Sequence, residues 1–126
     1  MTNTNTSHGT TPTYRNERKI LRAVVSALIA GGYTIRVEEC GELSEPLATP
    51  KSVVDYCSWD DQGRDRVVWA EGDFSLVPQM AGREDSYVHF IVSNGNDGLD
   101  VISDYGCSLS PIIDPIIDSM IESHGG

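Results

Sequence analysis

The sequence has no hydrophobic run near the roughly 20 apolar residues that a membrane-spanning helix requires. Its longest apolar stretches, residues 23–30 and the isoleucine-rich segment after Pro111, are both interrupted by polar residues. No basic segment followed by an apolar stretch opens the chain, so we expect no secretory signal. The cysteines are an odd number without metal-type spacing (Cys40, Cys57 and Cys107), which argues against a disulfide framework and for a reducing, cytoplasmic setting.

Positive charge is also scarce. The chain carries 9 Lys and Arg against 19 Asp and Glu, a formal net charge of −10, and no Lys or Arg follows Arg83. An acidic surface repels phosphates, so we expect neither direct nucleic-acid binding nor attachment to an anionic membrane. The exception is the first 22 residues, which have a local balance of +3.

Length and composition indicate one domain. A chain of 126 residues that is 39% hydrophobic can bury one core but not two. Residues 1–13 are rich in Thr and Asn and contain no large aliphatic side chain, so they predict a flexible tail. We therefore expect a single α+β domain over residues 14–126.

Three segments predict helices. From about Tyr14 to Ala30, apolar residues recur along one stripe, and the pair Gly31-Gly32 ends it. Thr49 and Pro50 suit the cap and first position of a short helix that reaches about Trp59. The last helix has apolar residues at positions 112, 113, 116, 117, 120 and 121, but Pro115 lies deep within it. That proline predicts either a kink or a restart with Asp114 as the cap.

Alternating or β-rich segments predict the strands. Residues 33–39 and 66–71 have this character, and 86–92 and 99–105 flank a loop rich in Asn, Asp and Gly that is typical of a hairpin. Residues 72–85 show little pattern and contain Pro78 and Gly82, so they predict a loop. The resulting order is α-β-α-β-β-β-α. It predicts a two-layer α+β sandwich with helices on one face of a mainly antiparallel sheet.

The hairpin segment from Gly95 to Tyr105, GNDGLDVISDY, resembles the motif of a family of small acidic proteins carried by phages, prophages and plasmids. The similarity covers roughly residues 15–123 and departs from the family pattern in a longer connection over 72–85. Other shared features are a GYTIRV-type strand at 32–37, a Gly-Glu loop at 41–42 and a Ser-Leu-x-Pro segment at 108–111. The resemblance implies a mobile-element accessory protein in the host cytoplasm and transfers no catalytic residue.

His89 is the first candidate for chemistry. It lies on a predicted strand beside the one that carries Asp100 and Asp104. A histidine with two carboxylates could hold a divalent metal or act as an oriented base in a small metal-dependent hydrolase. The alternative is a solvated outer sheet face, which we favour because no further ligand is evident, and we expect no cofactor.

Acidic side chains on the hairpin and last helix form a second candidate site. The candidates for this interaction surface are Asp97, Asp100, Asp104, Asp114, Asp118 and Glu122. The last three recur every helical turn, roughly 6 Å apart, which is similar to the spacing of phosphates along a nucleic-acid strand. Such a row is also the usual exposed face of an amphipathic helix.

Three hypotheses follow for function. The main one is a non-enzymatic accessory protein that binds an unidentified host or phage protein, with self-association through a sheet edge or the isoleucine-rich last helix as a further possibility. The second is an acidic DNA mimic that inhibits a host restriction or CRISPR nuclease. The third is the hydrolase that would use His89 with Asp100 or Asp104.

Overall fold

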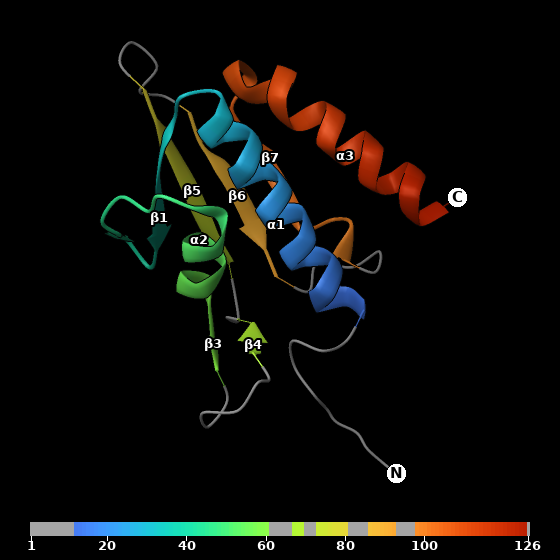
Figure 1. Cartoon of the computed structure of the whole chain (residues 1–126), viewed down its shortest axis with the longest axis horizontal. Helices are drawn as coiled ribbons and strands as arrows, with labels where there is room; N and C mark the ends of the chain where they lie inside the picture. The colour runs from blue at the N-terminus through green and yellow to red at the C-terminus, as the bar shows by residue number, and fades with distance from the viewer. Residues whose placement is uncertain (1–11, 61–66, 70–72, 81–85, 93–97, 126) are drawn as a thin grey trace.

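Helices and strands occupy most of the described chain. The computed structural model describes residues 12–60, 67–69, 73–80, 86–92 and 98–125 (Figure 1). In chain order the elements are α1 Pro12–Ala30, β1 Thr34–Glu39, β2 Glu42–Leu43, α2 Pro50–Cys57, β3 Ser58–Asp60, β4 Val67–Trp69, β5 Asp73–Gln79, β6 Val88–Ile91, β7 Ile102–Tyr105, the 3-10 turn η3 Cys107–Leu109 and α3 Ser110–Gly125. None of these helices combines the length and apolar character that a membrane crossing needs.

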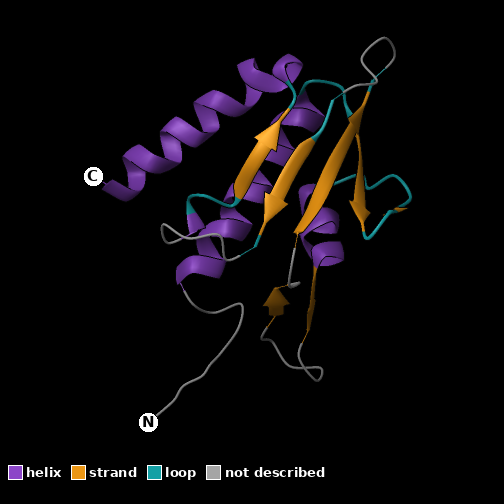
Figure 2. Ribbon diagram, turned by 180° about the vertical axis from the view of Figure 1, so that it is seen from behind, coloured by secondary structure: helices purple, strands orange, loops and turns teal. Residues whose placement is uncertain are grey.

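The main sheet has five strands in the order β2-β1-β5-β6-β7, and every neighbouring pair is antiparallel. Strands β3 and β4 form a separate pair. All three helices lie on one face of the main sheet, as the views from the front and from behind show (Figures 1 and 2). The predicted two-layer α+β sandwich and its order α-β-α-β-β-β-α are confirmed. The strand predicted over 66–71 is β4, and β2, β3 and β5 are additional strands.

Helix α1 ends as its two glycines predict. Gly32 has a φ of 96°, and the N–H of Tyr33 donates to the carbonyl of Leu28 at 3.0 Å. That pattern satisfies carbonyls at the helix end and needs a left-handed residue, which glycine adopts without strain. The helix begins at Pro12, so the flexible tail predicted over residues 1–13 overlaps the first two residues of α1. The rest of the predicted tail lies outside the described residues.

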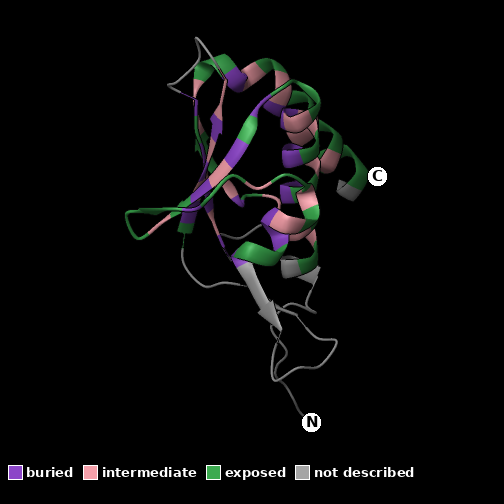
Figure 3. Ribbon diagram, turned by 60° about the vertical axis from the view of Figure 1, so that its left-hand side comes forward, coloured by how far each residue is buried: buried purple, intermediate pink, exposed green. Residues whose placement is uncertain are grey.

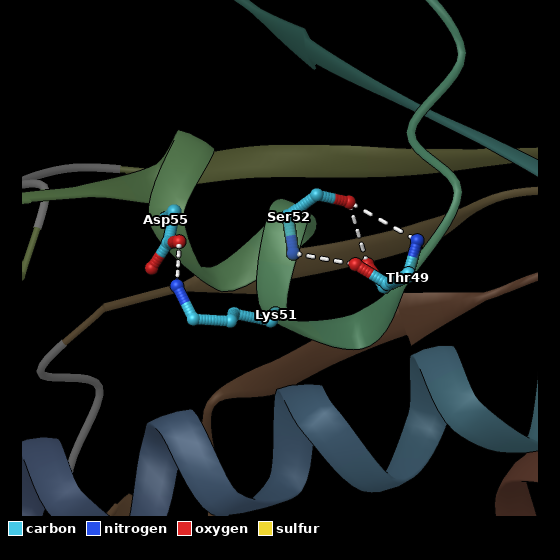
Figure 4. Close-up of polar contacts among 4 residues, drawn as sticks. All are labelled: Thr49, Lys51, Ser52 and Asp55. Carbon is cyan, nitrogen blue, oxygen red and sulfur yellow. Dashed lines mark hydrogen bonds and ion pairs between the residues drawn. The ribbon is translucent and has the colours of Figure 1, made fainter.

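Helix α2 also begins as predicted, with Pro50 as its first residue. The N–H of Ser52 donates to Oγ1 of Thr49, and the N–H of Thr49 donates to Oγ of Ser52, each at 3.1 Å (Figure 4). These reciprocal bonds satisfy two backbone donors at the start of the helix. One turn along, Lys51 pairs with Asp55 at 2.7 Å on the exposed side.

The prediction of a loop over residues 72–85 is wrong in its first half, because β5 forms the centre of the sheet. Phe74, Leu76 and Pro78 alternate with less buried residues along it, which is a strand pattern that Pro78 had obscured. Proline lacks an N–H, but β6 pairs with β5 only as far as Leu76. No ladder hydrogen bond to β6 is lost at Pro78, so the strand tolerates it.

The core lies between the sheet and the helices (Figure 3). The rings of Phe74 and Phe90 stack in it with centroids 5.1 Å apart. Val88, Phe90 and Val92 are buried, as the hairpin pattern predicts. Helix α1 contributes one continuous buried stripe, formed by Ile20, Leu21, Val24, Val25 and Leu28.

Helix α3 runs from Ser110 to Gly125 as one element that includes Pro115. The predicted restart at Asp114 is therefore wrong. Pro115 is exposed, so its ring points away from the core. Figure 1 shows α3 beginning beside the C-terminal end of α1 and diverging from α1 towards its own C-terminus.

Candidate functional site

The face of the main sheet opposite the helices is open. No helix in the described part of the chain covers it, and Figure 2 shows the strands from this side with the helices behind them. Its side chains alternate with the core residues and are half-buried, and they mix polar with apolar groups: Arg36, Ser75, Val77, His89 and Ile91. This face therefore presents chemically active groups directly to solvent.

Three polar side chains form a continuous hydrogen-bonded line across three neighbouring strands of this face. Nε2 of His89 on β6 lies 3.1 Å from Oδ2 of Asp73 on β5. Nδ1 of the same ring lies 2.8 Å from Oγ of Ser103 on β7. The side chain of His89 is 33% exposed and that of Asp73 is 62% exposed. We refer to Asp73, His89 and Ser103 as the polar relay.

The proton positions in the polar relay follow from its partners. An ionised carboxylate accepts hydrogen bonds only, so the neutral ring of His89 carries its proton on Nε2, where it donates to Asp73. Nδ1 is then unprotonated and accepts from the hydroxyl of Ser103. That hydroxyl has a second, longer acceptor in the backbone carbonyl of His89, at 3.3 Å. The relay thus has the connectivity of a serine, a base and an orienting carboxylate.

A β-bulge places Ser103 in this line. The register pairs His89 with Asp104 and Phe90 with Ile102, so Ser103 is an extra residue in β7. In a regular strand Ser103 and Asp104 would point to opposite faces. The bulge breaks that alternation and re-aims side chains locally, which brings both residues towards the open face.

The structure gives His89 different side-chain partners from those predicted. Asp104 lies opposite His89 in the register but accepts from the hydroxyl of Tyr87 at 2.8 Å and from the backbone N–H of Tyr105 at 2.9 Å. Asp100 precedes β7 and does not share a strand face with Asp104. In the described segments, no group of three His, Cys, Asp or Glu side chains is placed to hold a metal ion.

Asp104 has a structural role at the edge of the sheet. β7 is an edge strand, and its exposed backbone groups could pair with a strand of another chain. The carboxylate caps one of these groups, the N–H of Tyr105, and the bulge at Ser103 distorts the edge further. The bond from Tyr87 to Asp104 also raises the pKa of Tyr87, because it favours the protonated phenol. This edge is protected against strand addition.

The predicted acidic row on the last helix is present. Asp114, Asp118 and Glu122 are all exposed on successive turns of α3. Asp114 accepts a short hydrogen bond from the hydroxyl of Tyr105 and so ties α3 to the end of β7. That bond, with burial and the charges of Asp114 and Asp118, raises the pKa of Tyr105 to about 12.

The other three candidates of the predicted acidic surface lie apart from this row. Asp104 is engaged at the edge of β7, and Asp100 is exposed in the turn before that strand. Asp97 lies outside the described residues. The continuous part of the surface is therefore the row on α3.

An apolar row runs beside the acidic row. Ile113 is fully buried, Ile117 is half-buried, and Ile121 is 48% exposed. Towards its C-terminus α3 diverges from α1, so less of this row is covered there (Figure 1). Residues three and four positions apart are neighbours on a helix, so Asp118 adjoins both Ile121 and Glu122. We call Ile117, Asp118, Ile121 and Glu122 the α3 surface.

A groove opens on the other side of α3, where that helix diverges from the start of α1. Its volume is about 250 Å³, and it is lined by Asn16, Lys19, Ile20, Leu99, Met120 and Ser123. Arg15, Lys19 and Arg22 are exposed near it on α1, as the charge pattern of the sequence indicates. Of these three, Lys19 is the one that lines the groove.

A second acidic region, which the sequence analysis missed, lies at the opposite edge of the sheet. Glu38, Glu42 and Glu45 are exposed there, and Glu39 is half-buried. The run of glutamates around residue 40 was a visible signal. Its residues surround β2, the edge strand on this side, and just beyond β2 the N–H of Val37 on β1 donates to Oγ of Ser44 at 2.9 Å.

The three cysteines have different environments. Cys57 is buried, and burial raises the pKa of its thiol, which makes it a poor nucleophile. Cys40 and Cys107 are exposed free thiols. Cys107 begins the short turn η3 before α3.

No family model, no curated protein and no solved structure matches the chain. The structure itself therefore gives only the architecture: an α+β sandwich in which one face of the sheet is open and helix α3 is only partly covered. The similarity to a phage and plasmid family thus remains a prediction from the hairpin motif.

Proposed function

We propose that the protein acts by binding another protein through the α3 surface, as an accessory protein of a phage or other mobile element in the host cytoplasm. The observation that carries this proposal is the apolar row of α3, which continues from the buried Ile113 to the exposed Ile121. An apolar row that runs on into solvent costs free energy unless another surface covers it.

The charge beside the apolar row selects the kind of partner. Asp118 and Glu122 adjoin Ile117 and Ile121 on consecutive turns. A partner that covers the isoleucines therefore meets two carboxylates at the margin of the contact. Its matching surface would be an apolar depression flanked by Lys or Arg, and the net charge of −10 would speed the encounter at low ionic strength.

The same charges make a second copy of the chain a poor partner at this surface. Two α3 helices packed antiparallel through these faces would bring carboxylates of both copies together, and like charges in contact cost free energy. The edges of the sheet offer little alternative, since Asp104 and the bulge protect β7, and the other edge strand, β2, has only two residues. Self-association thus gains no support from the charges or from the sheet edges, and a basic partner is favoured.

The test is quantitative affinity capture from host lysate, at low and high ionic strength, with three variants. Ile121→Ser removes the apolar contact, and Asp118→Asn/Glu122→Gln removes the two charges. Glu38→Gln/Glu42→Gln removes the same number of charges at the opposite edge and is the matched control. We expect both α3 variants to lose the partner, the control to keep it, and high salt to weaken capture by the wild type.

Two outcomes contradict the proposal. Equal loss in the Glu38→Gln/Glu42→Gln control would mean that only net charge matters. Full retention by both α3 variants would place the binding surface elsewhere. Circular dichroism of each variant checks that the fold is intact.

A second candidate function is supported by the exposed, one-turn spacing of Asp114, Asp118 and Glu122. Carboxylates spaced in this way can imitate phosphates, so the protein would occupy the DNA groove of a host restriction or CRISPR nuclease. In that case the captured partner binds DNA, and duplex DNA displaces it from the wild-type protein. Capture that DNA leaves undisturbed would remove this candidate and leave the main proposal standing.

A further inference from the structure

The polar relay joins a nucleophile, a base and a carboxylate in one line. Oγ of Ser103 lies 2.8 Å from Nδ1 of His89, and Nε2 lies 3.1 Å from Oδ2 of Asp73. With the ring neutral and Asp73 ionised, the hydroxyl donates to Nδ1 and Nε2 donates to the carboxylate. Asp73 holds the ring in the tautomer that leaves Nδ1 free to accept a proton. A serine hydroxyl becomes a useful nucleophile when a neighbouring base takes its proton as it attacks.

The two ring nitrogens are used in reverse compared with the familiar serine-hydrolase triad, in which Nε2 faces the serine. Proton transfer requires only that one nitrogen faces the hydroxyl and the other faces the carboxylate, and both conditions are met. The β-bulge supplies this geometry, because it carries Ser103 to the same face as His89. Bulges occur often beside reactive sites for this reason.

The relay is open to solutes. Asp73 and Ser103 are exposed, and His89 is half-buried. The two cavities described in this structure, at the ends of α1, are lined by other residues. A small ester can therefore reach Ser103, but water is not excluded, so the low-dielectric advantage of a closed active site is missing.

We propose that Ser103, with His89 as its base and Asp73 as a positioning residue, is a surface nucleophile that accepts acyl groups from small activated esters. This activity is independent of the proposed binding function and uses none of the residues of the α3 surface. Acylation of Ser103 is expected to be much faster than release of the acyl group, because the leaving group of an activated ester departs far more readily than the serine oxygen of the acyl-serine.

The step is an acyl transfer that needs no redox partner. Oγ of Ser103 bonds to the carbonyl carbon of the ester while its proton passes to Nδ1 of His89. The bond between that carbon and the leaving oxygen breaks, and the alcohol leaves with the proton from His89. Water later attacks the acyl-serine, releases the carboxylic acid and restores the hydroxyl.

The experiment uses 4-nitrophenyl acetate with the full-length protein, followed by intact-mass and peptide mass spectrometry. The wild type should gain one acetyl group on Ser103, and Ser103→Ala should abolish that adduct. His89→Ala should slow it by about 100-fold, the lower end of the range for general-base catalysis. Asp73→Asn should slow it less, and Asp73→Glu should restore part of the rate.

Ser75 provides the matched control. It lies on the same face, directly opposite His89 in the β5–β6 register, but its hydroxyl is not part of the line. Ser75→Ala should leave acetylation of Ser103 unchanged, and Glu38→Gln/Glu42→Gln, which changes exposed residues outside both proposed sites, should do the same. If His89→Ala unfolds, the surface substitutions Ser103→Ala and Asp73→Asn still decide the matter.

Three results would overturn the proposal. One is acetylation of Ser103 no faster than that of Ser75 in the wild type. Another is an unchanged rate at Ser103 after the substitution of His89 or Asp73. The third is nitrophenol release that persists in Ser103→Ala and stops in His89→Ala, since the imidazole alone would then be reacting. Any of these would leave the polar relay as a cross-strand hydrogen-bond network only.

Discussion

Helices α1 and α3 look alike as sequences and behave differently in the structure. Both carry aliphatic residues three and four positions apart. Helix α1 lies against the sheet with α2 beside it, and its stripe from Ile20 to Leu28 is almost fully buried. Helix α3 packs against α1 from one side (Figure 3). It buries Ile113, while Ile121 remains 48% exposed.

The comparison teaches that the same period can build a core or present a surface. The period tells only that one stripe of a helix is apolar. What covers the stripe depends on where the helix lies relative to the sheet and its neighbours. Under the proposed function, α1 serves stability and the C-terminal half of α3 serves binding. The following predictions test that division from the largest expected effect to the smallest.

Truncation of the buried stripe should have the largest effect. Leu21→Ala leaves a cavity at a site with no exposure and should lower the free energy of unfolding by about 2–5 kcal/mol. Ile121→Ala, on the exposed part of α3, should change it by less than about 0.5 kcal/mol. Urea unfolding measures both, and similar losses in the two variants would erase the distinction between the helices.

The second largest effect should be a difference in amide hydrogen-exchange rates between α1 and α3. Amides in the middle of α1 should exchange only on global unfolding, because their side chains are part of the core. Amides in the last two turns of α3 should exchange by local opening, since few buried contacts hold that end. Protection of the α3 end equal to that of α1 would show that an interaction absent from this structure covers it.

Alkaline pH should weaken the attachment of α3. The hydroxyl of Tyr105 donates to Asp114, which raises the pKa of Tyr105 from 10.0 to about 12 in the folded protein. The bond contributes fully while the phenol is protonated in both folded and unfolded states. As pH rises from about 10 to about 12, the unfolded state loses its proton first, so this contribution to stability is lost.

Tyrosinate absorbance and the free energy of unfolding, both measured as functions of pH, test this prediction. Tyr105→Phe should remove the highest tyrosine titration and the matching alkaline loss of stability, and α3 amides should exchange faster. Tyr87→Phe is the control, since Tyr87 bonds to Asp104 on β7 and makes no recorded hydrogen bond to α3 among the described residues. Equal effects of the two substitutions on α3 exchange would contradict the role of the Tyr105–Asp114 bond.

Neutralising the acidic row should have the smallest effect on stability. Asp118→Asn/Glu122→Gln changes exposed groups and should leave the unfolding midpoint nearly unchanged. At most, the smaller net charge should raise the midpoint slightly. The same variant is expected to lose the partner in affinity capture. A large loss of stability would instead make these carboxylates part of the fold and weaken their assignment to binding.

The elements that the sequence predicted correctly are those with a strong local cause. Gly31-Gly32 ends α1, Thr49 caps α2, and the hairpin pairs β6 with β7, each because nearby residues demand it. Strand β5 was missed because Pro78 reads as a breaker. The strand tolerates Pro78 because the pairing between β5 and β6 reaches only as far as Leu76. No local sequence pattern reveals where that pairing stops.

The polar relay could not be predicted for two related reasons. Asp73 lies in the segment that was expected to be a loop, so no neighbour of His89 was sought there. Ser103 reaches His89 only because one extra residue in β7 shifts the register. A shift by one residue moves a side chain to the other face, so strict alternation selected the wrong partners.

Composition, charge and hydrophobic period by themselves determined that this is an acidic chain with an α+β fold and helices on a single sheet face. Those properties act along the chain and survive any choice of register. The tertiary structure alone decided which apolar stripe is covered and which carboxylate meets which hydroxyl. Both depend on strand pairing and helix placement, where contacts between residues distant in sequence outweigh the local pattern.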